Sequence, residues 1–280
     1  MNHQGTLKNP NGGIEWTHIF GPRTGYTSNS VKGCQHACRW LMPDGQIAIC
    51  YAEATAERFP GKWYAKGFGT ISFDETELAA IRKLKSPAGI FIDSMSDLFG
   101  KNVPDEWIKK VGATIRDCPQ HIFFSLTKNP GRFASIASGS MFERWHPNWL
   151  VGISVPPTFM FGHELTVAQQ NAWLKRALEF LRDSPARRRW ISIEPLSFDV
   201  SEIIGQSDTP LDWAVIGAAT NGAQTFQPTE TNLTNCLRVL NEKKIPVFMK
   251  GNLDPGFVEI CGSHWREEFP TMTPASTIPA

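Results

Sequence analysis

Two short apolar runs that end in polar residues stand out in the sequence: Gly89-Ile90-Phe91-Ile92-Asp93 and His121-Ile122-Phe123-Phe124-Ser125-Leu126-Thr127. Apolar residues at consecutive rather than alternate positions are typical of parallel strands that are buried on both faces. The same pattern extends outward in both directions along the chain. Further candidate strands cover residues 14–17, 70–73, 150–155, 190–194, 213–217 and 246–250.

The segments between these runs have the spacing of amphipathic helices. The apolar stripes consist of Trp107, Ile108, Val111 and Ile115, then Leu174, Ala177, Leu178 and Leu181, and finally Leu233, Cys236, Leu237 and Leu240. Alternating strands and helices predict a parallel sheet, closed as a barrel or open and doubly wound. No G-x-G-x-x-G motif follows an early strand, which disfavours the dinucleotide-binding open sheet.

We therefore predict an α/β fold: a full or partial (β/α) TIM-type barrel with parallel strands. It forms a single domain over residues 1–270, followed by a disordered tail over residues 271–280, which carry no charge.

The composition excludes several classes of protein. The 280 residues include 41% hydrophobic and 20% charged residues, with a net charge of +1, so the chain has no overall attraction to nucleic acid. The one tight basic run, Arg187-Arg188-Arg189, is interpreted as a solvated helix end before a strand. No apolar stretch approaches the ~20 residues that span a bilayer, and no secretion signal begins the sequence. We expect a cytoplasmic protein with reduced cysteines and no membrane partner.

Polar residues follow several of the predicted strands. In a barrel the reactive groups stand at the carboxyl ends of the strands and in the loops that follow them. These groups are residues 93–97, residues 127–129, Ser154, Glu194, residues 220–221 and Lys250. Their number predicts a polar pocket at this edge of the sheet.

The cysteines Cys34, Cys38 and Cys50 fall within one short stretch. Three thiolates can hold three irons of a [4Fe–4S] cluster and leave the fourth iron open to a small molecule. The same cysteines, together with His36 or another histidine, are equally compatible with a structural zinc. The spacing alone does not separate the two. The other cysteines, Cys118, Cys236 and Cys261, lie in or beside apolar elements and are expected to pack as small hydrophobes.

The interval between Cys38 and Cys50 reads as a hairpin. The arms, residues 39–42 and 46–49, flank Pro43-Asp44-Gly45, a strong turn sequence. Paired arms would bring Cys38 and Cys50 to roughly 5 Å, the separation of neighbouring strands. The long interval is therefore compatible with one cluster.

Several motifs occur together and in a consistent order. They are Gly13-Ile14-Glu15-Trp16-Thr17, Cys50-Tyr51-Ala52-Glu53, Ala56-Glu57-Arg58-Phe59, Ile92-Asp93-Ser94-Met95-Ser96-Asp97-Leu98-Phe99, Leu126-Thr127-Lys128-Asn129-Pro130, Ser192-Ile193-Glu194-Pro195-Leu196, Leu211-Asp212-Trp213-Ala214-Val215-Ile216-Gly217 and Val247-Phe248-Met249-Lys250. As a set they resemble the phage- and prophage-associated three-cysteine family related to radical S-adenosylmethionine enzymes, including spore photoproduct lyase. The radical enzymes commonly space their cysteines C-x3-C-x2-C, and only the first interval matches here.

The resemblance implies a radical enzyme of the isomerase or lyase type. Its cofactors would be a [4Fe–4S] cluster on Cys34, Cys38 and Cys50 and S-adenosylmethionine, which is cleaved to a 5′-deoxyadenosyl radical with an electron from a donor such as flavodoxin. The candidate cofactor-binding residues are Tyr51, Asp93, Ser94, Ser96, Glu194 and Asn221. The candidate catalytic residues are Lys128, Glu194 and Lys250. Alternatively, Tyr51 starts a helix, Lys128 is a loop cation, and Glu194 pairs with a lysine of the barrel.

The substrate that the resemblance suggests is a nucleobase-like group, in particular a modified thymine in phage DNA, handled in the host cytoplasm. The aromatic residues Trp145, Trp149, Phe159 and Phe161 are candidates for stacking a flipped base, or else belong to the core or to a pocket lid. One alternative is radical synthesis of a small metabolite such as a deazapurine precursor. A second is a zinc-stabilised, non-enzymatic nucleic-acid-binding module.

Overall fold

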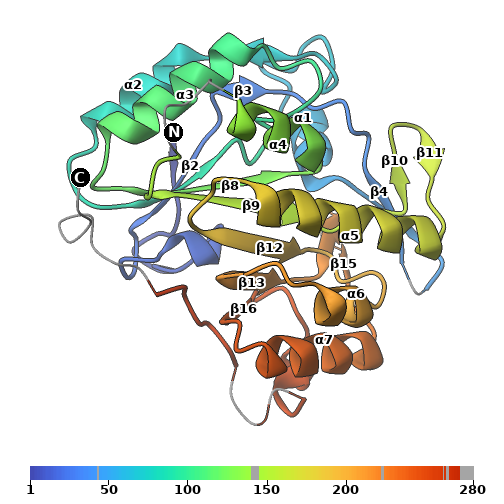
Figure 1. Ribbon diagram of the computed structural model, residues 1–280. Helices are drawn as coiled ribbons and strands as arrows, with labels where there is room; N and C mark the ends of the chain where they lie inside the picture. The colour runs from blue at the N-terminus through green and yellow to red at the C-terminus, as the bar shows by residue number, and fades with distance from the viewer. Residues whose placement is uncertain (43, 140–144, 222–223, 261, 263–264, 272–280) are drawn as a thin grey trace.

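A computed structural model describes residues 1–42, 44–139, 145–221, 224–260, 262 and 265–271. Its main feature is an eight-stranded sheet with the order β1-β2-β7-β8-β9-β12-β13-β16 (Figure 1). These strands are β1 (Asn2–His3), β2 (Gly25–Ser28), β7 (Gly89–Ile92), β8 (Ile122–Thr127), β9 (Trp149–Ser154), β12 (Arg189–Ile193), β13 (Trp213–Ile216) and β16 (Val247–Met249). Every pairing from β2 to β16 is parallel, and β1 is antiparallel to β2.

The helices cover one face of this sheet (Figure 1). They are α2 (Glu75–Lys83), α3 (Asp105–Asp117), α4 (Pro130–Ser138), α5 (Val167–Asp183), α6 (Ser201–Gln206) and α7 (Glu230–Glu242), and their apolar stripes join one core with alternate residues of the strands. The stripes predicted in α3, α5 and α7 are confirmed. Helices on one face identify a partial barrel rather than a doubly wound sheet. In the described part of the chain, no helix is both long and apolar enough to cross a bilayer.

The sheet does not close, so the full TIM-type barrel is wrong and the partial barrel is confirmed. Both edges that closure would join are already paired with antiparallel segments. On one side β1 covers β2, and on the other residues 266–268 cover β16, where Met249 N donates to Arg266 O over 2.7 Å and Glu268 N to Val247 O over 3.0 Å. With their hydrogen bonds satisfied, the two edges have no free groups to offer one another.

Six of the predicted strands are confirmed with shifts of a residue or two, and two predictions are corrected. Residues 14–17 contain a short 3₁₀ helix, η1 (Glu15–Thr17), instead of a strand. Residues 70–73 contain only β6 (Ser72–Phe73), which pairs with β3 (Val31–Lys32) outside the main sheet. The strand that takes the first parallel position is β2, whose sequence Gly-Tyr-Thr-Ser lacks an apolar run. The predicted tail beyond Thr271 lies outside the described residues.

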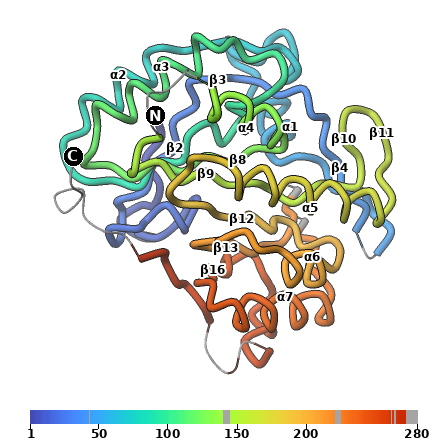
Figure 2. The backbone as a smooth tube through the Cα atoms, in the orientation of Figure 1, coloured from blue at the N-terminus to red at the C-terminus, as the bar shows by residue number. Residues whose placement is uncertain are grey.

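The remaining elements lie at the carboxyl ends of the strands or follow the last of them. They are β4 (Arg39–Leu41), β5 (Ile47–Ile49), α1 (Tyr51–Arg58), β10 (Phe159–Met160), β11 (His163–Glu164), β14 (Ala219–Asn221), β15 (Gln224–Phe226) and η2 (Pro255–Val258). The tube in Figure 2 shows β4, β10 and β11 on the right of the molecule, on the side away from α2 and α3.

Aromatic side chains fill the face of the sheet that carries no helices. Trp16 of η1 lies among Phe91, Phe124, Trp190 and Trp213, with ring centroids 4.8, 5.4, 5.1 and 5.9 Å away. Trp16, Trp190 and Trp213 are essentially excluded from solvent. This second core covers the apolar face that closure into a barrel would otherwise bury.

We expect Gly152→Ala in β9 to destabilise the protein by about 1–3 kcal/mol, because a buried strand has no room for the methyl group. A Cβ at Gly152 would lie 2.7 Å from Trp190 Nε1 and 2.8 Å from its Cδ1. Urea unfolding gives the free energy of unfolding. Gly69→Ala is the matched control, because a Cβ there meets nothing within 4 Å. Equal stability of the two variants would contradict this account of the inner core.

Candidate functional site

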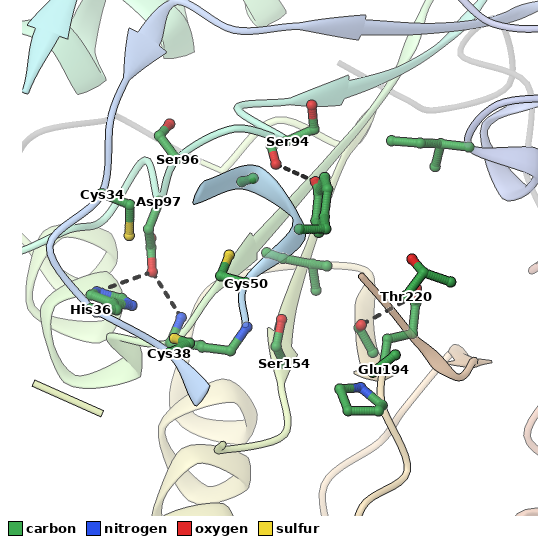
Figure 3. A pocket seen from close by; sticks show the side chains of 18 of the residues that line it. Cys34, His36, Cys38, Cys50, Ser94, Ser96, Asp97, Ser154, Glu194 and Thr220 are labelled. Atoms are coloured by element: carbon green, nitrogen blue, oxygen red, sulfur yellow. Dashed lines mark hydrogen bonds and ion pairs between the residues drawn. The ribbon is translucent and has the colours of Figure 1, made fainter. Parts of the chain in front are cut away.

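A cavity of about 280 Å³ lies at the carboxyl ends of the parallel strands, with Trp16 and Phe91 of the inner core in its wall. The polar groups predicted to meet at this edge do so (Figure 3). Its lining includes Asp93, Ser94, Ser96, Asp97, Thr127, Lys128, Ser154, Glu194, Thr220 and Lys250. Asn129 does not join them, because its side-chain amide donates to Phe99 O over 3.0 Å. Asn221 ends β14 beside the pocket, but its side chain lies outside what the structure describes.

The hairpin predicted between Cys38 and Cys50 is confirmed. β4 and β5 pair antiparallel, with Arg39 opposite Ile49. Cys38 immediately precedes Arg39 and Cys50 immediately follows Ile49, so the two cysteines lie at the open end of the hairpin. The described part of the turn has Gly45 N donating to Met42 O and Gln46 N to Asp44 Oδ1; Pro43 lies outside the described residues. Cys38 and Cys50 therefore approach each other across the hairpin.

Two contacts fix the hairpin against its surroundings. Arg39 makes a two-pronged ion pair with Glu53 of α1, with Nη1–Oε2 and Nη2–Oε1 distances of 2.5 and 2.9 Å. A small core joins the hairpin to β14 and β15; its buried members are Cys38, Trp40, Met42, Ala48, Ala219 and Phe226. Cys50 is the N-cap of α1, so this helix starts at the cysteine that ends the hairpin.

Cys34 comes from a separate turn that is held close to residues 68–70. Its backbone N donates to Phe68 O over 2.9 Å. Gly33 has φ of 85°, and a Cβ there would lie 2.3 Å from Thr70 O, so only glycine allows this approach. Cys34, Cys38 and Cys50 all line the cavity, and Figure 3 shows them around one space.

The three thiols suit a multi-iron cluster by their chemistry. Burial raises the pKa of Cys34 and raises that of Cys38 to about 12, so both are neutral thiols until a cation displaces their protons. Among the described residues, no group of three or more His, Cys, Asp or Glu side chains is arranged to hold a metal ion. A cubane cluster differs from a single ion because each cysteine binds a different iron, so its sulfurs stand apart.

Asp97 connects the loops that form this side of the cavity, a role that sequence analysis did not assign. Its Oδ2 accepts hydrogen bonds from Thr127 Oγ1 at 3.0 Å and Lys128 N at 2.8 Å and lies 3.6 Å from His36 Nε2. Its Oδ1 accepts from Phe99 N over 2.9 Å. A buried carboxylate with these partners ties the loops after β7 and β8 to the turn between Cys34 and Cys38. The motif Ser96-Asp97 carried no signal of this, since none of the three partners that Oδ2 meets is local.

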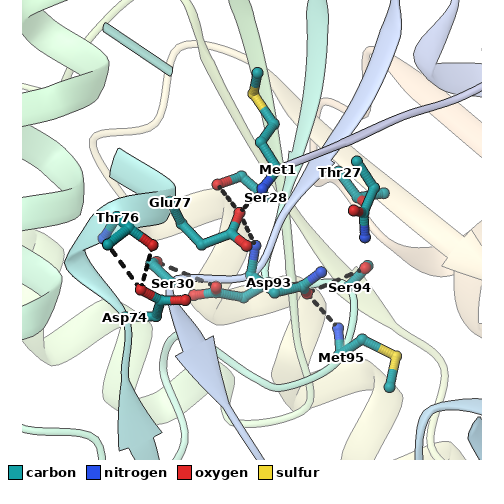
Figure 4. A network of polar contacts seen from close by, with 12 residues as sticks. Met1, Thr27, Ser28, Ser30, Asp74, Thr76, Glu77, Asp93, Ser94 and Met95 are labelled. Atoms are coloured by element: carbon teal, nitrogen blue, oxygen red, sulfur yellow. Dashed lines mark hydrogen bonds and ion pairs between the residues drawn. The ribbon is translucent and has the colours of Figure 1, made fainter. Parts of the chain in front are cut away.

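Asp93 is the predicted cofactor-binding residue with the most unusual surroundings (Figure 4). Its φ of 59° lies in the left-handed region, and its Oδ1 accepts from Ser30 Oγ at 3.2 Å and Val31 N at 2.9 Å. Its Oδ2 is buried without a hydrogen-bond partner in the described structure, beside the cavity. Burial raises the pKa of Asp93 to about 7. Because this value is above the ordinary one, the folded protein favours the neutral acid, and its contribution to stability is lost as the pH rises through 7.

A second polar network joins residues 28–32, α2 and the loop after β7 next to Asp93. Glu77 Oε2 accepts hydrogen bonds from Ser28 Oγ at 3.1 Å and Asn29 N at 3.2 Å, and it pairs with the amino group of Met1 (Figure 4). Lys32 pairs with Glu77 and with Asp74 at 3.3 and 3.6 Å. The Asn29 side chain accepts from Ser94 Oγ and Met95 N. This network fixes the loop after β7.

Glu194 and Lys250 form an ion pair on the side of the cavity opposite the three cysteines. Their Oε2–Nζ distance is 2.7 Å, and their side chains are 18% and 21% exposed. Gly217 leaves room for both, since a Cβ there would lie 3.0 Å from Lys250 Cδ and 3.2 Å from Glu194 Cγ. The interpretation of Glu194 as the partner of a barrel lysine is thus confirmed, and both residues remain at the cavity. Glu15 lies near them, and burial raises its pKa.

The other candidate residues lie at the cavity in more constrained positions. Ser96 Oγ donates to Val31 O over 3.0 Å, and Tyr51 OH donates to Ser94 O. Tyr51 begins α1, as its alternative interpretation held, yet it also lines the cavity. Lys128 Nζ stands 5.8 Å from the ring centroid of Trp40, whose buried Nε1 has no hydrogen-bond partner in the described structure.

Burial and pairing test two predictions, the four aromatic residues for stacking a base and the basic run of residues 187–189. Trp145 and Trp149 stack on each other in the main core with centroids 4.2 Å apart, so neither is available to a flipped base. Of the other two aromatic candidates, Phe161 packs edge-on against His36 at 4.9 Å, and Phe159 is half-buried in β10. The basic run is not a solvated helix end: α5 ends at Asp183, Arg187 and Arg188 lie in the connection that follows, and Arg189 begins β12. Arg188 pairs with Asp212, and Arg189 Nε donates to Leu181 O over 2.8 Å.

Comparison with known proteins gives a family and little more. No curated protein matches the chain. A solved structure described as "PhdJ bound to substrate intermediate" is 11% identical, with a TM-score of 0.35 and coverage of 81% of this chain and 59% of that chain. Similarity of that size supports no conclusion about function. The family model "Protein of unknown function (DUF5131)" matches residues 11–252, which include the cysteine hairpin and all parallel strands. The protein belongs to the DUF5131 family.

Proposed function

We propose that this protein is a radical S-adenosylmethionine enzyme. The observation that carries the proposal is the meeting of Cys34, Cys38 and Cys50 at one cavity on the carboxyl-end rim of a parallel half-barrel. Three thiols leave one iron of a [4Fe–4S] cluster without a protein ligand. When bound, the cluster would supply the electron that cleaves S-adenosylmethionine and so starts hydrogen abstraction from the substrate.

The residues of the cavity have distinct tasks in this proposal. Cys34, Cys38 and Cys50 would hold the cluster, and Asp97 keeps the turn that carries Cys34 and Cys38 in place. Asp93 Oδ2, buried and unpartnered in the described structure, would accept a hydrogen bond from the amino group of S-adenosylmethionine. The hydroxyls of Tyr51, Ser94 and Ser96 border the same part of the cavity, and the aromatic wall of Trp16 and Phe91 excludes water.

The opposite side of the cavity would receive the substrate. Glu194 and Lys250 provide charged groups there. Lys128 reaches the cavity from the thiol side, where its Nζ stands 5.8 Å from the ring centroid of Trp40, and Leu126 adds an aliphatic wall. Flat polar groups that need both hydrogen bonds and stacking suit such a lining. We propose a nucleobase-like substrate that is isomerised or remodelled at carbon, with a flavodoxin-type donor that supplies the electron.

Cluster binding should depend on the three cysteines of the cavity alone. Anaerobic reconstitution of the wild type should give about four irons and as many sulfides per chain, and Cys34→Ser, Cys38→Ser and Cys50→Ser should each lose most of this iron. Cys118→Ala and Cys236→Ala are matched controls, because both thiols lie in the main core. Iron and sulfide analysis measures the outcome; one tightly bound zinc per chain in place of iron would refute the proposal.

The affinity for S-adenosylmethionine should depend on pH through Asp93. Because the pKa of Asp93 is about 7, its carboxylate forms between pH 6 and 8, and the affinity for the cationic cofactor should rise over that interval. Asp93→Asn should weaken binding by about ten- to a hundred-fold at pH 8 and remove this part of the pH dependence. Calorimetry on the reconstituted protein measures both. Parallel pH profiles for the wild type and the variant would exclude Asp93 from the cofactor site.

The roles of Glu194 and Lys250 can be separated by comparing stability with binding. Glu194→Gln should lower the free energy of unfolding by about 1–3 kcal/mol, because Lys250 keeps its charge and loses its partner. The loss is smaller than for a fully buried pair, because both side chains are partly exposed to solvent. The double variant Glu194→Gln/Lys250→Met should recover part of that loss. If the pair also binds ligand, the double variant stays about ten-fold weaker for S-adenosylmethionine or substrate despite its recovered stability. Recovery of affinity together with stability would assign the pair a structural role only.

A further inference from the structure

The segment of residues 58–68, which follows α1, combines exposed cations with aromatic rings. It reads Arg58-Phe59-Pro60-Gly61-Lys62-Trp63-Tyr64-Ala65-Lys66-Gly67-Phe68 and contains no acidic residue. We call it the basic–aromatic segment. It is folded as successive turns, in which Tyr64 N donates to Pro60 O and Gly67 N to Tyr64 O, both over 2.8 Å. Its surface is therefore defined by backbone hydrogen bonds.

The cations of this segment are not used to hold the fold. Arg58, Lys62 and Lys66 are exposed, and none forms an ion pair with a carboxylate of the described residues. Arg58 instead stands 5.1 Å from the ring centroid of Phe59, and Lys62 Nζ 4.4 Å from that of Trp63. Three unpaired positive charges at one site create a local field that the net charge of +1 conceals.

The segment contains one strongly exposed aromatic ring, Phe59, and three half-buried ones, Trp63, Tyr64 and Phe68. Phe59 is 65% exposed, and Tyr51, at the other end of α1, is 47% exposed. Tyr64 and Phe68 have ring centroids 5.9 Å apart. Trp63 is anchored, with Lys32 Nζ 5.2 Å from its ring centroid as well as Lys62. An exposed ring beside unpaired cations is typical of a surface that stacks bases and binds phosphates.

The basic–aromatic segment is continuous with the cavity. Phe68 lines the cavity, and its carbonyl oxygen accepts the hydrogen bond of Cys34 N. Tyr51 also lines the cavity and hydrogen-bonds to Ser94 O in the loop after β7. A single-stranded nucleic acid bound along the segment would therefore pass the mouth of the cavity, where an unstacked base can enter.

We infer that the basic–aromatic segment binds single-stranded nucleic acid and presents one base of that strand to the cavity. The inference deepens the proposed function, on which it rests for the chemistry at that base. It specifies that the nucleobase-like substrate belongs to a single strand and which surface of the protein binds that strand. Phosphates meet Arg58, Lys62 and Lys66, and a base stacks on Phe59.

A single strand is favoured over an acidic electron-donor protein by the rings. The cations would attract an acidic protein surface, but that attraction does not account for Phe59, an exposed ring flanked by a cation. Every base has a flat face that stacks on such a ring whatever its identity. A duplex presents no free base face, so it would lose the stacking contribution.

The test measures binding of a fluorescein-labelled oligo-dT of about 15 nucleotides by anisotropy at several salt concentrations, with the full-length reconstituted protein. The variant Arg58→Ala/Lys62→Ala/Lys66→Ala should bind more weakly, and its dependence of log K on log salt should be about 2 units shallower. Phe59→Ala should weaken binding about 5- to 100-fold with an unchanged salt slope. A duplex of equal length should bind more weakly than the single strand.

The matched control is Lys83→Ala/Lys85→Ala/Lys109→Ala, which removes the same charge from exposed positions at α2 and α3 and should bind like the wild type. Equal weakening by both triple variants, or none by either, would overturn the inference. Unchanged oligo-dT binding with slower reduction of the cluster by reduced flavodoxin would assign the segment to the electron donor instead. Binding needs no catalysis, so a protein that binds the strand but never cleaves S-adenosylmethionine would sink the proposed function and leave this inference standing.

Discussion

The packing of Trp16 against the inner face of the sheet is the contact on which the rest of the molecule depends. A parallel sheet with helices on one face leaves the other face apolar and in need of cover. Trp16 reaches that face from η1 and packs among Phe91, Phe124, Trp190 and Trp213. Because this aromatic core fills the interior, the sheet can remain a half-barrel, with its edges paired to β1 and to residues 266–268.

The cavity is a consequence of that arrangement. The aromatic core fills the interior only part of the way to the carboxyl ends of the strands, and Trp16 and Phe91 form part of the cavity wall. Asp97 then joins the loops on one side into a single unit with the turn that carries Cys34 and Cys38. On the other side, Glu194 and Lys250 neutralise each other. The site therefore has one side with the three thiols, Asp97 and Lys128, and another side with the Glu194–Lys250 ion pair.

The excursion of the chain between β2 and β7 carries the thiol side of the cavity and the surface next to it. The hairpin and α1 leave the sheet at the cysteines, and the basic–aromatic segment follows α1 directly along the chain. One excursion between β2 and β7 thus carries the thiols, an aromatic part of the cavity rim and the unpaired cations. The opposite rim, built from β12, β13 and β16 and the residues that follow them, carries the paired charges. The residues proposed to bind a cluster and those proposed to bind a single-stranded nucleic acid therefore lie on one excursion outside the parallel strands.

Patterns that depend on neighbouring residues were predictable from the sequence. Consecutive apolar residues identified six parallel strands, the helical stripes identified α3, α5 and α7, and the Pro-Asp-Gly turn identified the cysteine hairpin. Polar strand ends predicted which residues line the cavity, because all parallel strands end at the same edge. What the tertiary structure decided are pairings between distant segments: β2 as the first strand, the insertion of Trp16, the capped edges that prevent closure and the hydrogen bonds of Asp97. Local steric and hydrophobic preferences are written in each stretch of the sequence, whereas these contacts exist only where packing brings remote residues together.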